Sequence, residues 1–218
     1  MKNKIVLFSN MKGGTGKTTL CELFATYAVE KGLPIIVYDA DTQLSLYKDR
    51  QDDVSENPDA ETLWDIYPLI VDDNIKGQIS SLKNVPGVVL IDCPGNIDNE
   101  NLQEIFAAAD IVIMPFRYDR KNVRETETFS EILRQCSSAR ILYAPNMITS
   151  MDAKRENLRE ARNLAYKHFK QDKNNKDFIL SEIMDRICLR DCNTIALNSK
   201  QRVELRNAFD KIIDFIKI

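Results

Sequence analysis

Histidine and paired cysteines are scarce in this chain. Its 218 residues include one histidine, His168, and five cysteines, of which no two show the spacing of a C-x-x-C motif. This excludes the usual zinc-binding pattern and gives no sign of a disulfide framework. A lone histidine with no neighbouring ligands is typical of a surface position. We therefore expect buried thiols in a reducing compartment and no histidine-based catalysis.

Long apolar runs and an excess of positive charge are also missing. No apolar segment approaches the roughly 18 residues that a spanning helix needs. Met1 leads directly into a short apolar segment, without the features of a signal peptide. The net charge of −3 excludes a globally basic nucleic-acid binder, so any contact with DNA must come from a local patch. With 44% apolar and 29% charged residues, we expect one domain over residues 1–218, located in the cytoplasm.

The stretch Lys4–Leu20 combines an apolar run, a glycine-rich turn and a helical pattern. Backbone N–H groups in such a turn, together with the positive end of the following helix, form a concave site that suits a phosphate. Lys17 would contact the β- and γ-phosphates, and the hydroxyl of Thr18 would ligate a magnesium ion. A glycine-rich turn with incidental lysines is the alternative. The predicted phosphate loop consists of Lys12, Gly13, Gly14, Thr15, Gly16, Lys17, Thr18 and Thr19.

One departure from the ordinary G-x-x-x-x-G-K-[ST] pattern is informative. Met11 stands at the first glycine position, and a second lysine, Lys12, follows it. The resulting string K-G-G-x-G-K-T resembles the deviant Walker A motif of the ParA/MinD family, whose members are ATPases that dimerise face to face around two nucleotides. The resemblance implies that ATP binds here and that Lys12 reaches the phosphates of the partner subunit.

Two acids follow the next predicted strand, Pro34–Tyr38. Because ligands of open parallel sheets bind beyond the carboxyl ends of the strands, Asp39 and Asp41 should lie beside the phosphate loop. The family pattern D-x-D-P-Q reads D-A-D-T-Q here. The resemblance implies that Asp41 positions the hydrolytic water, with Asp39 in support. Alternatively, both acids cap a helix that begins near Ser45.

A second chemical landmark is the apolar run Val88–Asp92, which ends in an acid. Such a run is typical of a strand buried on both faces. It has the form of a Walker B strand, whose carboxylate, here Asp92, holds magnesium through water. A simple acid at a strand end is the alternative. Gly95 could donate a backbone N–H to the γ-phosphate, which would make residues 92–96 a nucleotide-sensing switch.

Apolar periodicity predicts the remaining elements. A polar loop is expected at Asp52–Pro58, with Trp64 as a packing anchor in the helix that follows. Helices are expected over Lys17–Lys31, Ala60–Tyr67, Ile75–Leu82, Asn99–Ala109, Asp152–Lys170 and Gln201–Ile218, and further strands over Ile5–Phe8, Ile111–Pro115 and Arg140–Asn146. Together with the resemblance, this predicts an α/β fold: an open, mostly parallel twisted sheet with helices on both faces, the P-loop NTPase fold of the deviant Walker A type.

Polar residues in the second half have less specific signals. Asn146 lies where relatives use a polar residue to read adenine, and Asp185 stands where relatives have proline before an adenine-contacting loop. A basic cluster at the next helix is either a solvated surface or part of a nucleotide-dependent interface; it consists of Arg117, Arg120, Lys121 and Arg124. The resemblance places nonspecific DNA contacts near Arg186, Arg190, Lys200, Arg202 and Arg206.

The resemblance implies a slow ATPase that acts as a dimer switch in partitioning DNA or another cargo. ATP and Mg²⁺ are the implied cofactors. The implied partners are a second copy of the chain, a ParB-like activator and nonspecific DNA, with nucleoid association in the ATP state.

Two alternatives stay open. The apolar stripe of Gln201–Ile218 suits either a MinD-like membrane helix or a core-docking helix, and its acids weaken attraction to anionic lipid. Liposome flotation against binding to plain DNA, each with ATP, separates a MinD-like membrane-bound protein from a partition ATPase. The other alternative is a P-loop ligase or reductase of small metabolites. An iron-protein type of reductase needs cysteines near the nucleotide, and only Cys93 lies close by.

Overall fold

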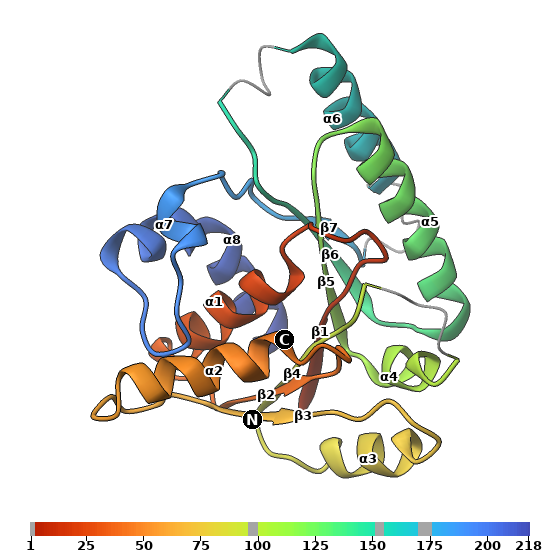
Figure 1. Cartoon of the computed structure of the whole chain (residues 1–218). Helices are drawn as coiled ribbons and strands as arrows, with labels where there is room; N and C mark the ends of the chain where they lie inside the picture. The colour runs from red at the N-terminus through yellow and green to blue at the C-terminus, as the bar shows by residue number, and fades with distance from the viewer. Residues whose placement is uncertain (1–2, 96–99, 151–154, 170–175) are drawn as a thin grey trace.

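Seven strands form one open sheet in the order β3-β2-β4-β1-β5-β6-β7 (Figure 1). Every pair of neighbouring strands is parallel. The computed structural model describes residues 3–95, 100–150, 155–169 and 176–218. The strands are β1 (Lys4–Phe8), β2 (Ile35–Asp39), β3 (Asp65–Pro68), β4 (Val88–Asp92), β5 (Ile111–Phe116), β6 (Arg140–Pro145) and β7 (Phe178–Ile179).

The central strands are apolar throughout because both faces of the sheet are covered. In β1, Val6 and Phe8 belong to one hydrophobic core, whereas Ile5 and Leu7 belong to the other. Successive side chains of a strand point to opposite faces, so this five-residue run supplies both cores. The predicted open, mostly parallel sheet with helices on both faces is confirmed.

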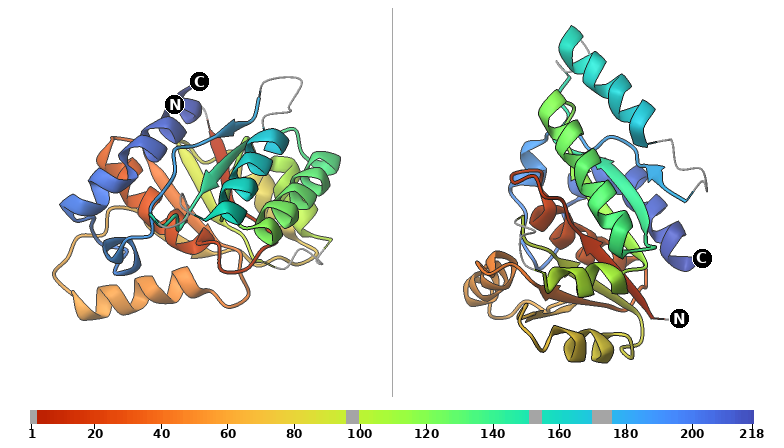
Figure 2. Two further views of the ribbon diagram at one scale, coloured as in Figure 1. Left: turned by 90° about the horizontal axis from the view of Figure 1, so that it is seen from above. Right: turned by 90° about the vertical axis from the view of Figure 1, so that its right-hand side faces the viewer.

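The helices divide between the two faces, as the views in Figure 2 show. Helices α1, α2, α7 and α8 cover one face, and α3, α4, α5 and α6 cover the other. The helices are α1 (Lys17–Glu30), α2 (Ser45–Glu56), α3 (Ile75–Leu82), α4 (Leu102–Ala108), α5 (Arg120–Cys136), α6 (Glu156–Phe169), α7 (Ile187–Arg190) and α8 (Ser199–Lys217). The helices predicted near α4 and α6 extend at their ends into residues 99, 152–154 and 170, which lie outside the described ranges.

The stripe of α8 is buried in the core. Phe209 of α8 packs edge-on against Phe24 and Tyr27 of α1, with ring centroids 5.2 and 5.5 Å apart. The hydroxyl of Tyr27 donates a hydrogen bond of 2.6 Å to Asp210. This confirms the core-docking interpretation of the stripe. No helix in the described part of the chain combines the length and apolarity that crossing a membrane requires.

One segment predicted as a helix is a strand. The expectation for Ala60–Tyr67 is wrong, because Asp65–Pro68 forms β3 at the edge of the sheet, paired with β2. Ile66 is buried between two exposed neighbours, which is the alternation of a strand. Trp64, just before it, is buried, which confirms its role as a packing anchor.

The predicted loop at Asp52–Pro58 is also wrong in its first half, because α2 continues to Glu56. Only Leu46 and Arg50 of this helix are buried, one turn apart, and most of the other residues are polar. A helix with so narrow a buried stripe carries almost no apolar periodicity. Tertiary contacts therefore define it. Arg50 donates hydrogen bonds to the carbonyl oxygens of Trp64 and Thr194.

A buried carboxylate lies near this contact. Glu22 of α1 is 5% exposed, and its Oε1 has no hydrogen-bond partner. Burial raises its pKa to about 7, and the Sγ of Cys192, 3.7 Å from Oε2, opposes the rise. The ordinary pKa of a glutamate is 4.5. Between pH 4.5 and about 7, the Glu22 carboxyl group is ionised in the unfolded chain but stays protonated in the folded one. The free energy of unfolding therefore falls as pH rises through this range.

We therefore expect Glu22→Gln to stabilise the protein at pH 8 and to have little effect at pH 5. The gain at pH 8 is at most about 3 kcal/mol, since one pKa unit corresponds to 1.36 kcal/mol. Thermal melting at both pH values measures it, with Glu56→Gln at the exposed end of α2 as the control. An equal change in melting temperature at pH 5 and pH 8 would contradict the assignment.

Candidate functional site

The carboxyl ends of β1, β2 and β4 lie side by side at one edge of the sheet. Asp92, the last residue of β4, is in register with Phe8 of β1 and with Asp39 of β2. The phosphate loop follows β1 directly and leads into α1. The structure thus brings together the predicted phosphate loop and both acidic strand ends. This is where open parallel sheets bind ligands.

The loop has the backbone conformation of an anion site. Gly14 and Gly16 have φ angles of +71° and +89°, which residues with a Cβ rarely adopt. Gly16 is also the N-cap of α1, so the free N–H groups of the first helical turn point into the loop. Backbone donors and the helix dipole therefore converge on one point, as phosphate binding requires.

Two asparagines hold this loop in place. The buried side chain of Asn10 accepts a hydrogen bond from the N–H of Lys12 (3.1 Å) and donates to the Pro115 carbonyl oxygen (2.8 Å). Asn146 donates from Nδ2 to the carbonyl oxygen of Thr15 (2.8 Å). A Cβ on Gly16 would lie 2.4 Å from that Nδ2. Gly16 is therefore required both by its φ angle and by the close approach of Asn146.

The predicted magnesium ligands are in contact. The hydroxyl of Thr18 donates a 2.7 Å hydrogen bond to Oδ2 of Asp92. Asp92 is 1% exposed, and its Oδ1 is buried without a hydrogen-bond partner. Burial raises the pKa of Asp92 to about 7, and the bond from Thr18 and the charge of Lys17 oppose the rise. A hydroxyl beside an unsatisfied carboxylate oxygen is a donor set that fits Mg²⁺ and its bound water.

The two loop lysines point to different places. The Nζ of Lys17 lies 3.4 Å from the position that a Cβ of Gly95 would occupy, which puts it between the phosphate loop and the predicted switch. The Nζ of Lys12 lies 3.3 Å from Oε2 of Glu125 on α5. Lys17 is therefore inside the candidate phosphate site. Lys12 is paired on the neighbouring helix.

The two acids at the end of β2, Asp39 and Asp41, have different surroundings. Asp39 is fully buried and accepts hydrogen bonds from the N–H groups of Asp41 (3.0 Å) and Tyr47 (3.1 Å). Tyr47 is in the first turn of α2, so Asp39 does cap that helix. The carboxylate of Asp41 accepts from the N–H of Gln43 (3.0 Å) and lies ahead of the helix. Its predicted action on water stays a prediction.

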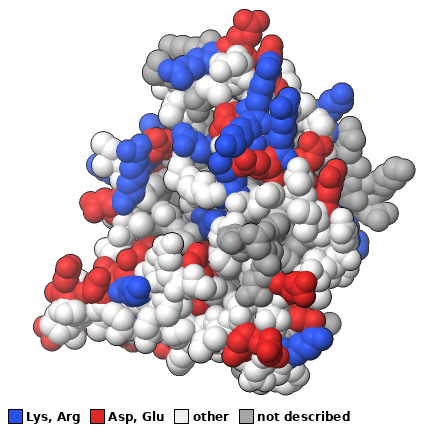
Figure 3. Space-filling model, turned by 45° about the vertical axis from the view of Figure 1, so that its right-hand side comes forward, with Lys and Arg blue, Asp and Glu red and all other residues white. Residues whose placement is uncertain are grey.

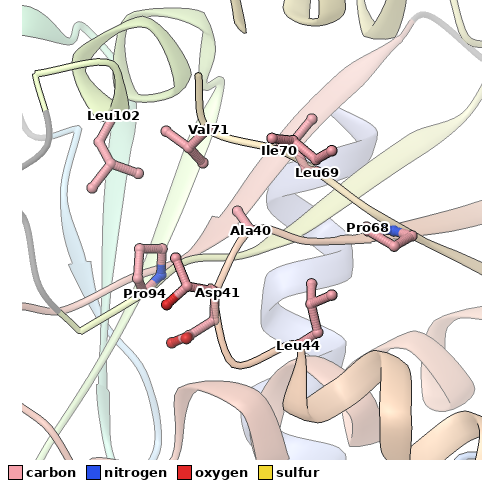
Figure 4. A pocket seen from close by; sticks show the side chains of 10 residues that line it. Ala40, Asp41, Leu44, Pro68, Leu69, Ile70, Val71, Pro94 and Leu102 are labelled. Atoms are coloured by element: carbon pink, nitrogen blue, oxygen red, sulfur yellow. The ribbon is translucent and has the colours of Figure 1, made fainter.

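Asp41 also lines a cavity of about 610 Å³ at the ends of β2, β3 and β4. Figure 4 shows its side chain next to Pro94, with Leu69, Ile70 and Leu102 on the far side of the hollow. The residues that face Asp41 across this cavity are mostly apolar. A group that enters this cavity would come directly to Asp41.

The predicted base-binding region lies next to α7. Asn146 and Asp185 line a smaller cavity of about 220 Å³, together with Met147 and Leu189. Arg190 binds the carboxylate of Asp185 through two hydrogen bonds of 2.9 and 2.5 Å and lowers its pKa. The observed partner of Asn146 is the phosphate loop. Its adenine role stays a prediction.

Lysine and arginine side chains gather on the face that carries α5, interleaved with acids (Figure 3). Several basic residues named from the sequence are paired within the chain: Arg120 with Glu160, Arg186 with Glu204, Arg190 with Asp185 and Arg202 with Glu30. Within the described ranges, Arg117, Arg124, Lys200 and Arg206 form no ion pair. These four are the basic positions most available to another molecule.

Sequence reasoning missed two residues of the site. Asn10 lies two residues after the end of β1 and directly precedes Met11 and Lys12, and nothing in its sequence context marks it as buried. Glu125 is four residues after Lys121, a common surface spacing, and nothing in the sequence links it to Lys12.

Cys93, the cysteine considered for a reductase, is buried, and this burial raises the pKa of its thiol. No group of three or more His, Cys, Asp or Glu side chains in the described residues could hold a metal ion.

Solved structures share this fold. A plasmid partition protein from Borrelia burgdorferi bound to AMPPNP superposes with a TM-score of 0.74 at 17% identity, covering 100% of both chains. The ATP complex of a McdA variant from Cyanothece gives 0.72 at 16% identity, covering 100% of this chain and 97% of that one. MinD in the MinC:MinD complex from Aquifex aeolicus gives 0.73 at 16% identity, covering 97% and 96%.

No curated protein sequence matches the chain. The profile of the CobQ/CobB/MinD/ParA nucleotide-binding domain matches residues 6–194, a range that includes the phosphate loop, the last three residues of β1 and all of β2 to β7. The chain therefore belongs to the CobQ/CobB/MinD/ParA family of nucleotide-binding domains, and its structural neighbours include a plasmid partition protein and the MinC:MinD complex.

Proposed function

We propose that the chain is an ATP-hydrolysing dimer switch that partitions or positions DNA or another cargo. One observation carries this proposal: the two loop lysines diverge, Lys17 toward Gly95 inside the phosphate site and Lys12 onto α5 outside it. One lysine suffices to bind phosphate in cis. The second is then available for phosphates that belong to another subunit.

Hydrolysis would depend mainly on positioning and charge stabilisation, as phosphoryl transfer requires. The loop N–H groups and Lys17 would bind the β- and γ-phosphates. Thr18 directly and Asp92 through water would hold Mg²⁺, which would neutralise charge on the phosphate oxygens. Asp41 would orient the attacking water. Lys12 of the partner subunit would add a second positive charge that stabilises the phosphate oxygens. Because the site is complete only in the dimer, the turnover would be slow until a ParB-like activator binds.

The ATP dimer would bind DNA without sequence preference. Lys200 and Arg206 on α8, which form no ion pair in the described residues, are the first candidates for phosphate contacts. A few cations on each of two subunits give weak binding that decreases steeply with salt. The buried stripe of α8 supports DNA rather than a membrane as the surface on which the protein moves. We place the protein in the cytoplasm, on the nucleoid when ATP is bound.

Lys12→Ala should retain ATP binding but lose ATP-dependent dimerisation, because only the trans contact is removed. Turnover should decrease on the order of 10²-fold or more, the usual effect of deleting one charge-stabilising group. Sedimentation with AMPPNP and a steady-state phosphate assay measure both. Lys83→Ala, which removes an exposed lysine outside the site, is the control. Wild-type turnover by a Lys12→Ala monomer would refute the trans role.

Asp41→Ala should accumulate an ATP-bound dimer that stays on DNA. The water is no longer oriented, so turnover should decrease on the order of 10²-fold to 10⁴-fold while ATP affinity is retained. Filter binding to plain duplex DNA with ATP, followed over time, measures the persistence of the complex. Asp73→Ala, an exposed acid close to the same cavity, serves as the control. Unchanged turnover would remove Asp41 from the mechanism.

A further inference from the structure

The first residues of the phosphate loop are fastened to α5 by a buried amide. Asn10 Nδ2 donates to Oγ1 of Thr126, 2.9 Å away, while its Oδ1 accepts the N–H of Lys12. Asn10 and Thr126 are both fully buried. The backbone of Lys12 is thus held at a fixed position relative to the middle of α5.

The side chain of Lys12 also contacts α5. Its partner is Glu125, the residue directly before Thr126. Its Oε2 lies 3.3 Å from the Nζ of Lys12. The other oxygen, Oε1, lies 3.9 Å from the Nζ of Lys121, one turn earlier on α5. Glu125 therefore stands between two lysines. If Lys12 leaves, Lys121 still offsets the charge of the carboxylate, so the exchange does not leave Glu125 unpaired.

The position of this pair sets its strength. The side chains of Lys12 and Glu125 are 27% and 29% exposed, so water screens them only in part. Pairs of this kind contribute a factor of roughly two to five each. Such a contact holds the lysine in place but yields to a triphosphate, which carries several charges and accepts shorter hydrogen bonds.

We propose that Glu125 is a positioning residue that holds Lys12 on its own subunit and must release it when the ATP dimer forms. This rests on the proposed trans role of Lys12. Each subunit exchanges the carboxylate of Glu125 for the phosphates of its partner. Glu125 thereby sets the ATP and protein concentrations at which the switch closes. Two pairs open per dimer, so the dissociation constant of the dimer depends on the square of the strength of one pair.

Glu125→Gln tests the proposal, because it keeps the shape of the side chain and removes its charge. The dissociation constant of the AMPPNP dimer should decrease roughly fourfold to twenty-fivefold, since two pairs, each worth about twofold to fivefold, are removed. The affinity of the monomer for a fluorescent ATP analogue should not change. Sedimentation velocity measures the first and fluorescence titration the second. Glu125→Asp, whose shorter side chain retracts from Lys12, should shift the dimer in the same direction.

Two further variants separate the possible results. Glu131→Gln removes the same charge from an exposed position on α5 and should leave the dimer unchanged. Glu125→Gln added to Lys12→Gln should not restore dimerisation. Promotion of the dimer in that double variant, or no promotion by Glu125→Gln alone, overturns the positioning role. If Lys12→Gln by itself dimerises like the wild type, the proposed trans function fails instead. Thermal melting of each variant confirms folding.

Discussion

The site depends on the register of β1, β2 and β4, whose carboxyl ends lie side by side. Backbone pairing places Asp39 beside Asp92 and places both beside the loop that follows β1. Burial raises the pKa of the Asp92 carboxyl group, and the nearby charges of Asp39 and Asp41 raise it further. A negative ligand is thus expected next to a cluster of carboxylates. Lys17 and a bound cation are what make that arrangement compatible with phosphate.

Hydrogen bonds with two buried asparagines hold the loop in its observed conformation. Asn10 at the end of β1 and Asn146 at the end of β6 reach it from opposite sides, and both make their hydrogen bonds in buried surroundings. Ordering a flexible loop on binding reduces affinity, and a loop already in its binding conformation avoids that loss. The two asparagines are therefore as much part of the phosphate site as the glycines.

The elements with strong local signals could be predicted from the sequence. Val88–Asp92 is apolar at four successive positions, and Lys4–Leu20 carries a motif whose spacing has a mechanical reason, so the strands and the loop were placed correctly. β3 could not be predicted, because its buried–exposed alternation rests on a single buried residue, Ile66. The strand is defined by its pairing with β2, which the sequence does not reveal. The contact of Lys12 with Glu125 joins residues more than a hundred positions apart, and only the fold brings them together.

The packing of α8 against α1 has a consequence for the far end of the chain. α1 begins at the phosphate loop, and its inner face rests on Phe209 and on the hydrogen bond between Tyr27 and Asp210. The carboxyl-terminal helix is thus a support for the helix that presents Lys17 and Thr18. A fusion, truncation or binding protein that displaces α8 would act on nucleotide affinity from the opposite end of the polypeptide. Tags intended for imaging are better placed elsewhere.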